Sequence, residues 1–219
     1  MPLVAVIFMK AVLFGDVLNV ELERYTPSLA YGMVFWRFIS GQILTNSMAI
    51  VGSQGIIKQR NFPLFSFILR NLTRAVFEFL YSFAAVTVVV LFYYIPTDVS
   101  VLLALPAVII VEITLLCSGF VLAMLCCRMP DLHGSLISAM RVLFLLTPII
   151  WLPEMVSGQK EFLLNLNPFY HLLETVRDPL IGQPIEWLNW QVSIGLMLIS
   201  ILLMNVVYHF LGRKSVFWI

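Results

Sequence analysis

Charged residues are scarce in this sequence. They make up 11% of its 219 residues, whereas a soluble domain carries about 25%. Hydrophobic residues make up 61%, and the mean hydropathy is +0.97. So few polar side chains cannot cover a globule in water, and we therefore expect an all-α membrane protein surrounded mostly by lipid. The net charge of +1 gives no reason to expect nucleic acid as a partner.

Cysteine and the common catalytic motifs are also scarce or absent. Of the three cysteines, Cys117 lies in an apolar run and Cys126 and Cys127 are adjacent, which fits neither a disulfide framework nor a zinc site. The chain has no G-x-x-x-x-G-K-S/T phosphate loop, no G-x-S-x-G elbow and no H-E-x-x-H pair. Asp131 and His133 are more typical of a helix cap and a turn than of a metal site. We therefore expect no catalytic, cofactor, metal or ATPase site in this chain.

Long apolar runs predict where the chain crosses the membrane. A crossing helix needs about 20 mostly apolar residues. Runs that meet this need lie at roughly 29–51, 66–96, 101–127, 135–152 and 191–211. The apolar start, residues 1–15, is too short to cross, and it lacks the basic region and cleavage site of a signal peptide. We interpret it as the end of a first span, with the N-terminus truncated, which gives six spans.

The distribution of charge predicts how these spans are oriented. Basic residues gather in alternate links between the spans, or near the span ends beside those links: Lys58, Arg60, Arg70, Arg74, Arg128, Arg141, Arg213 and Lys214. Acidic residues gather in the other links: Asp16, Glu21, Glu23, Asp98, Glu154, Glu161, Glu174, Asp178 and Glu186. Because cytoplasmic loops carry the excess of Lys and Arg, we expect both termini in the cytoplasm. Residues 153–184 then lie on the outer side.

The link after the second span predicts a short amphipathic helix on the membrane surface. Between residues 54 and 62, apolar Ile56 and Ile57 are followed by a basic stretch, and Pro63 then turns the chain. An interfacial loop that carries the positive charge of the cytoplasmic side explains the same residues. The alternative is a docking helix that fits a groove in a cytoplasmic partner.

The segment 153–184 predicts two short helices that enter the membrane from outside and return. Asn167 followed by Pro168 is typical of a helix start, and Pro179 and Gly182 are expected to end that helix. His171, Glu174 and Arg177 are spaced three apart and share a face. A plain extracellular ion-pair face, which meets water or protein, explains them, and a transferase site that uses His171 and Glu174 is an alternative.

Two ionisable residues lie deep inside predicted spans. Arg37 falls about a third of the way through the second span and Glu112 near the middle of the fourth. A lone charge in the membrane is costly, so a partner or a wet cavity is expected. We predict an Arg37–Glu112 ion pair or, failing that, two side chains that face one internal cavity.

Three stretches together resemble a known family. They are GIIKQRNFPL (55–64), FLLTPIIWLPEM (144–155) and LNPFYHLLETVRDPLIG (166–182). In this order and on these sides they are similar to the membrane subunit of ABC-2-type exporters, above all the permeases that export polysaccharide such as O-antigen. The resemblance covers essentially the whole chain but departs at its start, where such permeases carry an amphipathic helix and a complete first span.

The resemblance implies a bacterial inner-membrane permease that forms a homodimer. A separate cytoplasmic ABC ATPase subunit would hold ATP and Mg²⁺ and would receive a coupling helix. The residues of that helix would be Gln54, Gly55, Lys58, Gln59, Arg60 and Phe62. The hairpin 153–184 would be a pair of periplasmic re-entrant helices.

The substrate that the resemblance implies is an undecaprenyl-linked glycan, which moves along a path lined partly by aromatic rings. The rings proposed for this path are Phe35, Trp36, Phe38, Tyr81, Phe144, Trp151, Phe169 and Tyr170. Ordinary packing in the protein core or against lipid is the more common explanation for each of these rings. Capsule, teichoic acid, lipid and drug export by a permease of the same class remain as alternatives.

Overall fold

The computed structural model describes residues 22–59, 63–93, 99–155 and 159–211, together with Ile7, Met9 and Leu13. Within these residues the chain is helical and contains no β-strand. The α-helices are α2 (Leu22–Ser47), α3 (Gln54–Gln59), α4 (Phe65–Val90), α5 (Ala104–Arg128), α6 (Leu132–Leu146), α7 (Gln159–Asn165), α8 (Pro168–Ile181) and α9 (Trp187–Leu211). Short 3-10 helices are η1 (Val51–Ser53), η2 (Val99–Leu103) and η3 (Pro153–Met155). The predicted first span, residues 1–15, lies outside the described residues except at three isolated positions.

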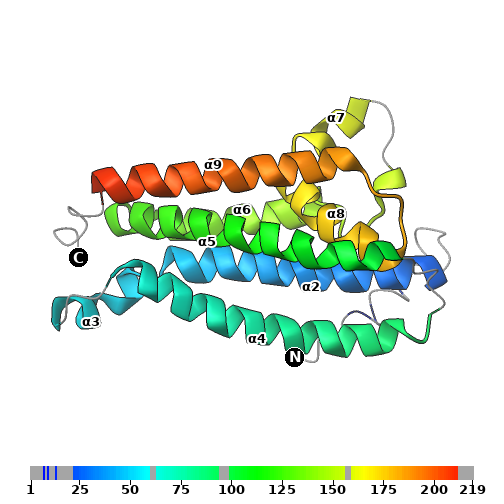
Figure 1. Cartoon of the computed structure of the whole chain (residues 1–219), viewed down its shortest axis with the longest axis horizontal. Helices are drawn as coiled ribbons and strands as arrows, with labels where there is room; N and C mark the ends of the chain where they lie inside the picture. Colours follow the sequence, from blue (N-terminus) through cyan, green and yellow to red (C-terminus); the bar gives the residue numbers. More distant parts are fainter. Residues whose placement is uncertain are drawn as a thin grey trace.

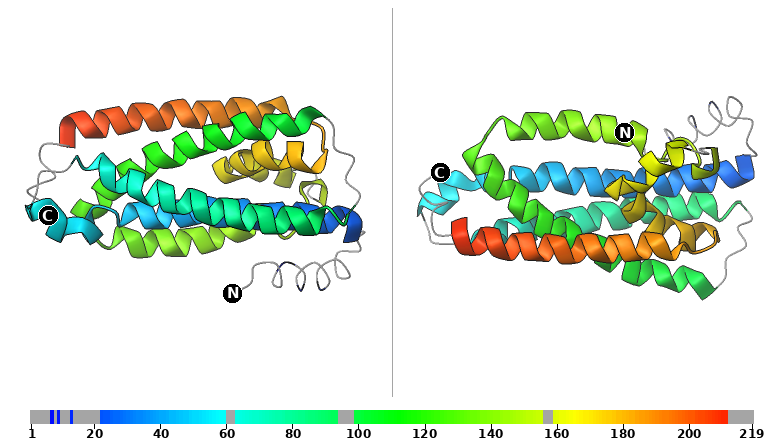
Figure 2. Two further views of the ribbon diagram at one scale, coloured as in Figure 1. Left: turned by 60° about the horizontal axis from the view of Figure 1, so that its bottom comes forward. Right: turned by 90° about the horizontal axis from the view of Figure 1, so that it is seen from above.

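The long helices α2, α4, α5 and α9 run side by side with the shorter α6 along the long axis of the molecule (Figure 1). Successive helices run in opposite directions, so the links between them gather at the two ends of the bundle (Figure 2). α3 lies at the end where α2 finishes, whereas α7 and α8 lie at the end where α9 begins (Figure 1). The helices described within the two segments that stand out in the sequence, α3 and the pair α7 and α8, are therefore at opposite ends.

Among the described residues, three helices are long and apolar enough to cross a membrane: Phe65–Val90, Val99–Arg128 and Trp187–Phe210. α6 is apolar too, but its 15 residues extend only about 22 Å. Thr147, which follows it, takes an extended conformation (φ −91°, ψ 136°). Because Pro148 disfavours a helical conformation in the residue before it, the predicted run 135–152 ends its helix early.

α2 is long but less apolar, and it lies in the interior of the bundle. Its 26 residues extend about 39 Å, and it packs against α4, α5, α6 and α8. Leu29 and Ile39 are fully buried, and so is the polar side chain of Asn46. Because its neighbours are protein rather than lipid, α2 tolerates polar residues that an outer helix would not.

The outer faces of the bundle are apolar. Large apolar side chains of α4 and α9 are exposed, among them Phe77 (70%) and Phe210 (69%). An exposed apolar surface of this extent is expected of a chain in contact with lipid or with another protein.

Candidate functional site

α8 lies at the end of the bundle where α9 begins, and local contacts define both of its ends. Asn167 caps its first turn: the side-chain oxygen accepts from a backbone N–H at 3.0 Å, and the amide donates to the Thr147 hydroxyl at 3.0 Å. Pro168 is the first helical residue, as predicted, and Gly182 ends the helix in a left-handed conformation (φ 68°). Pro179 does not end the helix, because it lies inside the last turn.

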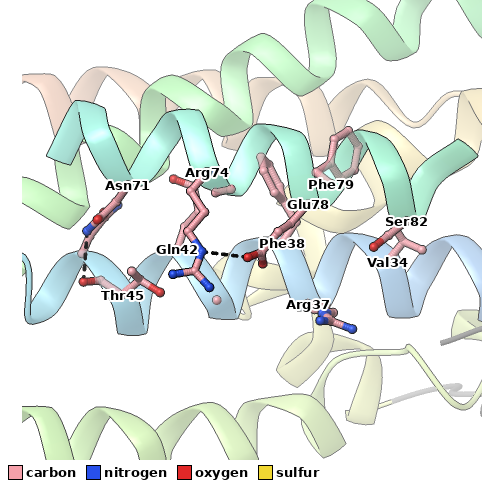
Figure 3. Close-up of a pocket in the computed structure, with 13 residues that line it drawn as sticks. Val34, Arg37, Phe38, Gln42, Thr45, Asn71, Arg74, Glu78, Phe79 and Ser82 are labelled. Carbon is pink, nitrogen blue, oxygen red and sulfur yellow. Dashed lines mark hydrogen bonds and ion pairs between the residues drawn. The ribbon is translucent and has the colours of Figure 1, made fainter. Parts of the chain in front are cut away.

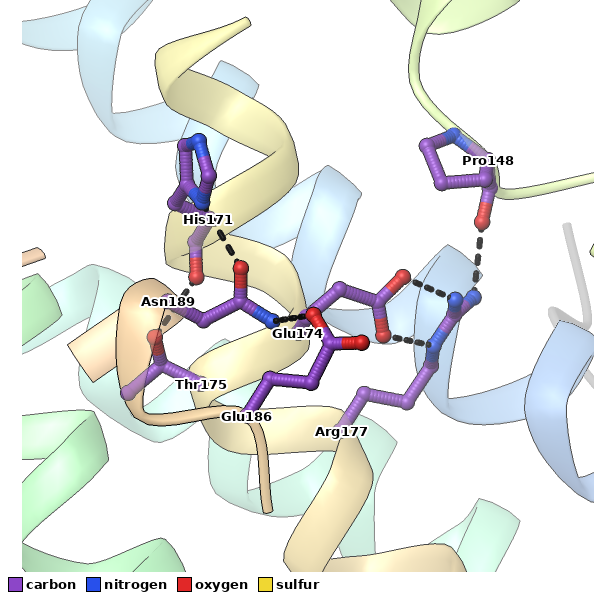
Figure 4. Close-up of polar contacts among 7 residues, drawn as sticks. All are labelled: Pro148, His171, Glu174, Thr175, Arg177, Glu186 and Asn189. Atoms are coloured by element: carbon purple, nitrogen blue, oxygen red, sulfur yellow. Dashed lines mark hydrogen bonds and ion pairs between the residues drawn. The ribbon is translucent and has the colours of Figure 1, made fainter. Parts of the chain in front are cut away.

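Glu174 and Arg177 form a buried ion pair on the inner face of α8 (Figure 4). Their side chains are only 3% and 1% exposed, so this charged face of α8 meets protein rather than water. Arg177 donates from Nε to Glu174 at 3.0 Å and from Nη2 to the other carboxylate oxygen. Its Nη1 donates to the Pro148 carbonyl at 2.7 Å, which ties α8 to the end of α6. Gly32 of α2 lies so close that an added Cβ would stand 3.3 Å from that nitrogen.

An adjoining side of α8 is joined to α9 by hydrogen bonds (Figure 4). His171 is 1% exposed. One ring nitrogen lies 2.7 Å from the Asn189 side-chain oxygen and the other 2.8 Å from the Asn165 carbonyl. Thr175 bonds to the Ser193 hydroxyl at 2.8 Å. Both nitrogens of His171 are therefore occupied within the protein, which argues against the transferase alternative because neither can reach a substrate.

A cavity of about 240 Å³ adjoins the ion pair. Ionisable residues that line it are Glu154, Tyr170, Glu174, Arg177, Asp178 and Glu186. Burial raises the pKa of Asp178, and the neighbouring Glu174 carboxylate raises that pKa further. Burial also raises the pKa of Tyr170. This end of the bundle therefore offers several oxygen atoms that accept hydrogen bonds, with one guanidinium already paired.

Three of the predicted pathway rings meet in one cluster. Trp36 of α2 lies with its ring centre 5.9 Å from that of Phe144 and 5.8 Å from that of Phe169. The cluster joins α2, α6 and α8, just inward of the cavity-bearing end. Because α8 contributes to it, a movement of α8 would separate these rings.

The other pathway rings are scattered. Phe35 and Phe38 pack against Phe79 of α4, with ring centres 5.3 and 4.6 Å apart. Tyr81 is 80% exposed on the outer face of α4. The indole of Trp151 donates to the carbonyl of Leu145 at 3.2 Å. Tyr170 is buried (6%) and lines the cavity described above.

The segment predicted to form a coupling helix contains the helix α3, which has one buried and one exposed isoleucine. Ile57 is buried (8%) in an apolar cluster that includes Phe67 of α4, whereas Ile56 is 45% exposed. Gln54 and Gly55 begin the helix, and Gly55 is exposed. Lys58 and Gln59 belong to its last turn, but their side chains lie outside the described part of the structure, as do Arg60 and Phe62 entirely.

The predicted Arg37–Glu112 ion pair is not formed. Glu112 instead accepts a hydrogen bond from the amide of Gln42, with 2.6 Å between Nε2 and Oε2. Arg37 is exposed and lines a cavity of about 180 Å³ between α2 and α4, together with Arg74 and Glu78, which pair with each other at 2.9 Å (Figure 3). The alternative in which both side chains face one cavity fails as well, since Glu112 does not line it.

Sequence reasoning missed the amides that make the interior polar contacts. Gln42 and Asn46 of α2 are 2% and 0% exposed, and Asn189 of α9 is 1% exposed. The available signal was an uncharged amide inside an apolar run, which costs free energy in lipid unless it is bonded to another helix.

Comparison with known proteins gives two findings. A family model described as ABC-2 type transporter matches residues 1–181. The chain is also similar to the O-antigen export system permease protein RfbA of Klebsiella pneumoniae, with 20% identity over 167 residues. The matched stretch covers 76% of this chain and 64% of that relative, so the chain spans less than two thirds of the relative's length.

Proposed function

The chain belongs to the ABC-2 type transporter family, and on that premise we propose that it is the membrane-spanning permease subunit of an ATP-driven exporter. ATP and Mg²⁺ bind in a separate cytoplasmic ABC ATPase subunit, since this sequence contains no phosphate loop. Two copies of the chain form a homodimer in the bacterial inner membrane. Each copy crosses six times, with both termini in the cytoplasm, and each docks one ATPase through α3.

One observation carries this proposal: α3 and the α7–α8 hairpin lie at opposite ends of the bundle. The basic residues Arg70 and Arg128 accompany α3, whereas Glu174, Asp178 and Glu186 accompany the hairpin. The positive-inside rule assigns the first end to the cytoplasm. The hairpin is then the periplasmic re-entrant element at the exit of the transport path.

The substrate that we propose is a lipid-linked polysaccharide similar to O-antigen. The name of the Klebsiella relative supports this class. So do the oxygen-lined cavity of about 240 Å³ and the rings of Trp36, Phe144 and Phe169 beneath it. Hydroxyl groups of a sugar donate to carboxylates, and the C–H faces of a sugar pack on aromatic rings. Capsule, teichoic acid, lipid or drug export is the alternative within the same family.

Docking is tested by crosslinking. Cysteine placed at Lys58 or Arg60 is expected to crosslink to a co-expressed ATPase, and cysteine placed at Leu163 in α7, which is 68% exposed at the opposite end, is not. Crosslinking from Leu163 but not from α3 would reverse the orientation and refute the proposal.

The transport path is tested by export of glycan to the cell surface. Phe169→Ala and Tyr170→Ala are expected to reduce export while the protein stays in the membrane at normal levels. Phe77→Ala, on the outer face of α4 and 70% exposed, serves as the matched control. Undiminished export in both hairpin variants would exclude these rings from the path.

A further inference from the structure

Glu112 lies in the middle of a membrane-spanning helix and has no cationic partner among the described residues. Its single hydrogen bond comes from Gln42 of α2, at 2.6 Å. Gln42 is 2% exposed, so water has little access to the contact. An ionised carboxylate in these surroundings would lack both a counter-charge and a solvent shell, which disfavours the ionised form.

Two oxygen atoms at this contact are left without a hydrogen-bond partner. They are Oε1 of Glu112 and Oε1 of Gln42, and both are buried. The planar amide of Gln42 and the planar carboxyl group of Glu112 are already joined by the hydrogen bond from Nε2 to Oε2. If Glu112 is ionised, both of these atoms are acceptors and neither can satisfy the other.

We propose that Glu112 is a proton-binding site inside the membrane. One proton, taken from water, sits on Oε1 of Glu112 and is donated to Oε1 of Gln42. The carboxylic acid and the amide then form a closed ring of two hydrogen bonds, in which each group donates once and accepts once. A single proton thus pairs both orphan oxygens and removes the uncompensated charge.

The proton reaches this site from the cavity of about 180 Å³ between α2 and α4, which Gln42 lines (Figure 3). The charged groups in that cavity are Arg37 of α2 and the Arg74–Glu78 pair of α4. The ionisable groups of α8 lie around its buried ion pair, at the end of the bundle where α9 begins. Those of α9 lie near its final residues. Arg141 of α6 is exposed. None of these cations pairs with Glu112 in the structure.

The ring joins α2 to α5. One turn further along α2, Asn46 packs so tightly on Gly119 of α5 that an added Cβ would stand 2.6 Å from the Asn46 amide nitrogen. Loss of the proton would leave two hydrogen-bond acceptors, Oε1 of Glu112 and Oε1 of Gln42, with no donor between them. We therefore expect the α2–α5 contact to be firm while Glu112 is protonated and to loosen as the pH rises.

The first test is labelling of the full chain in lipid nanodiscs with a hydrophobic carbodiimide, which reacts with protonated carboxyl groups in apolar surroundings. Peptide mapping is expected to find the label on Glu112, with the yield falling as the pH is raised. Asp131→Asn, which alters an exposed carboxylate that does not line this cavity, is expected to leave the labelling unchanged. Recovery of Glu112 unlabelled at mildly acidic pH would overturn the proposal.

The second test uses Glu112→Gln, whose amide reproduces both hydrogen bonds of the ring without a titrating proton. The wild-type unfolding midpoint is expected to fall from mildly acidic to mildly alkaline pH by more than that of Glu112→Gln. Infrared spectra are expected to lose one protonated-carboxyl C=O band in this variant and to shift that band in Gln42→Leu. Identical pH profiles, or an infrared difference confined to the carboxylate region, would show that Glu112 is ionised.

Discussion

Removal of one partner from the buried pair of α8 is expected to be among the most destabilising substitutions in the chain. Arg177→Met leaves the Glu174 carboxylate, 3% exposed, without its cation, and it leaves the Pro148 carbonyl without the donor that now lies at 2.7 Å. Breaking a buried ion pair in this way costs about 3–5 kcal/mol. Glu174→Met is expected to cost a similar amount, because it leaves the guanidinium buried and unpaired.

The double variant separates the effect of charge from the effect of packing. Glu174→Met with Arg177→Met replaces the pair by apolar side chains of similar length and leaves no unpaired charge of the pair, although the Pro148 carbonyl loses its donor at a cost of about 1–3 kcal/mol. The double variant is therefore expected to be more stable than either single variant. Arg74→Met is the matched control, because the Arg74–Glu78 pair is 80% and 55% exposed and contributes at most about 1 kcal/mol.

Reversible unfolding in mixed micelles, as the fraction of denaturing detergent is raised, measures these free energies. If Arg177→Met costs no more than Arg74→Met, the pair is not buried in the protein as the structure has it. If the costs of the two single variants simply add in the double variant, the two side chains do not interact, and the reasoning fails.

Three further outcomes are expected. Burial and the neighbouring Glu174 raise the pKa of Asp178, so at neutral pH the folded protein holds a proton that the unfolded chain has released. Stability should therefore fall as the pH rises towards that raised pKa. Asp178→Asn should flatten the profile of the unfolding midpoint against pH. Gly119→Ala should destabilise the folded protein by about 1–3 kcal/mol, since its Cβ would lie 2.6 Å from the amide nitrogen of Asn46. At Gly41 an added Cβ has open space, so Gly41→Ala should change the unfolding midpoint little. Asn167→Ala removes the cap of α8 and should cost about 1 kcal/mol in the same assay, and an unchanged midpoint would show that the cap bond does not form.

Helices and their ends could be predicted from the sequence wherever a local rule determines them. Apolar runs locate α4, α5 and α9 because lipid admits only long apolar helices. The pair Asn167–Pro168 locates the start of α8, because a cap and a proline act on the first turn alone. These rules depend on neighbours in the chain, so one sequence is enough to apply them.

What packs against a helix could not be predicted in the same way. The spacing of Glu174 and Arg177 places them on one face of α8, but nothing in that spacing shows that the face is turned inward against the Pro148 carbonyl. A periodic polar face indicates water when it belongs to an outer helix. Here it indicates contact with the rest of the bundle, because the residues that complete the bonds come from distant segments.

The Arg37–Glu112 prediction failed for a geometrical reason. A position deep inside a span does not determine which residue a side chain pairs with, because the direction around the helix axis decides which side chain meets the neighbouring helix. Gln42, which contacts Glu112, is five residues beyond Arg37 and so points about 140° away from it around α2. The side chain that faces α5 is therefore the amide, and the guanidinium points elsewhere.

α2 shows why mean hydropathy is lower in a helix enclosed by other helices than in one on the outside of the bundle. It is not among the helices that reach the hydropathy expected of a span, yet it contains many of the best-buried side chains. Its amides bond to neighbours: Gln42 to α5 and Asn46 to Asn71 of α4, the latter at 3.3 Å. An outer helix gains stability from apolar residues because its surroundings are lipid, whereas an enclosed helix gains it from complementary polar contacts. Leucine at position 42 or 46 would therefore make α2 more hydrophobic and the protein less stable.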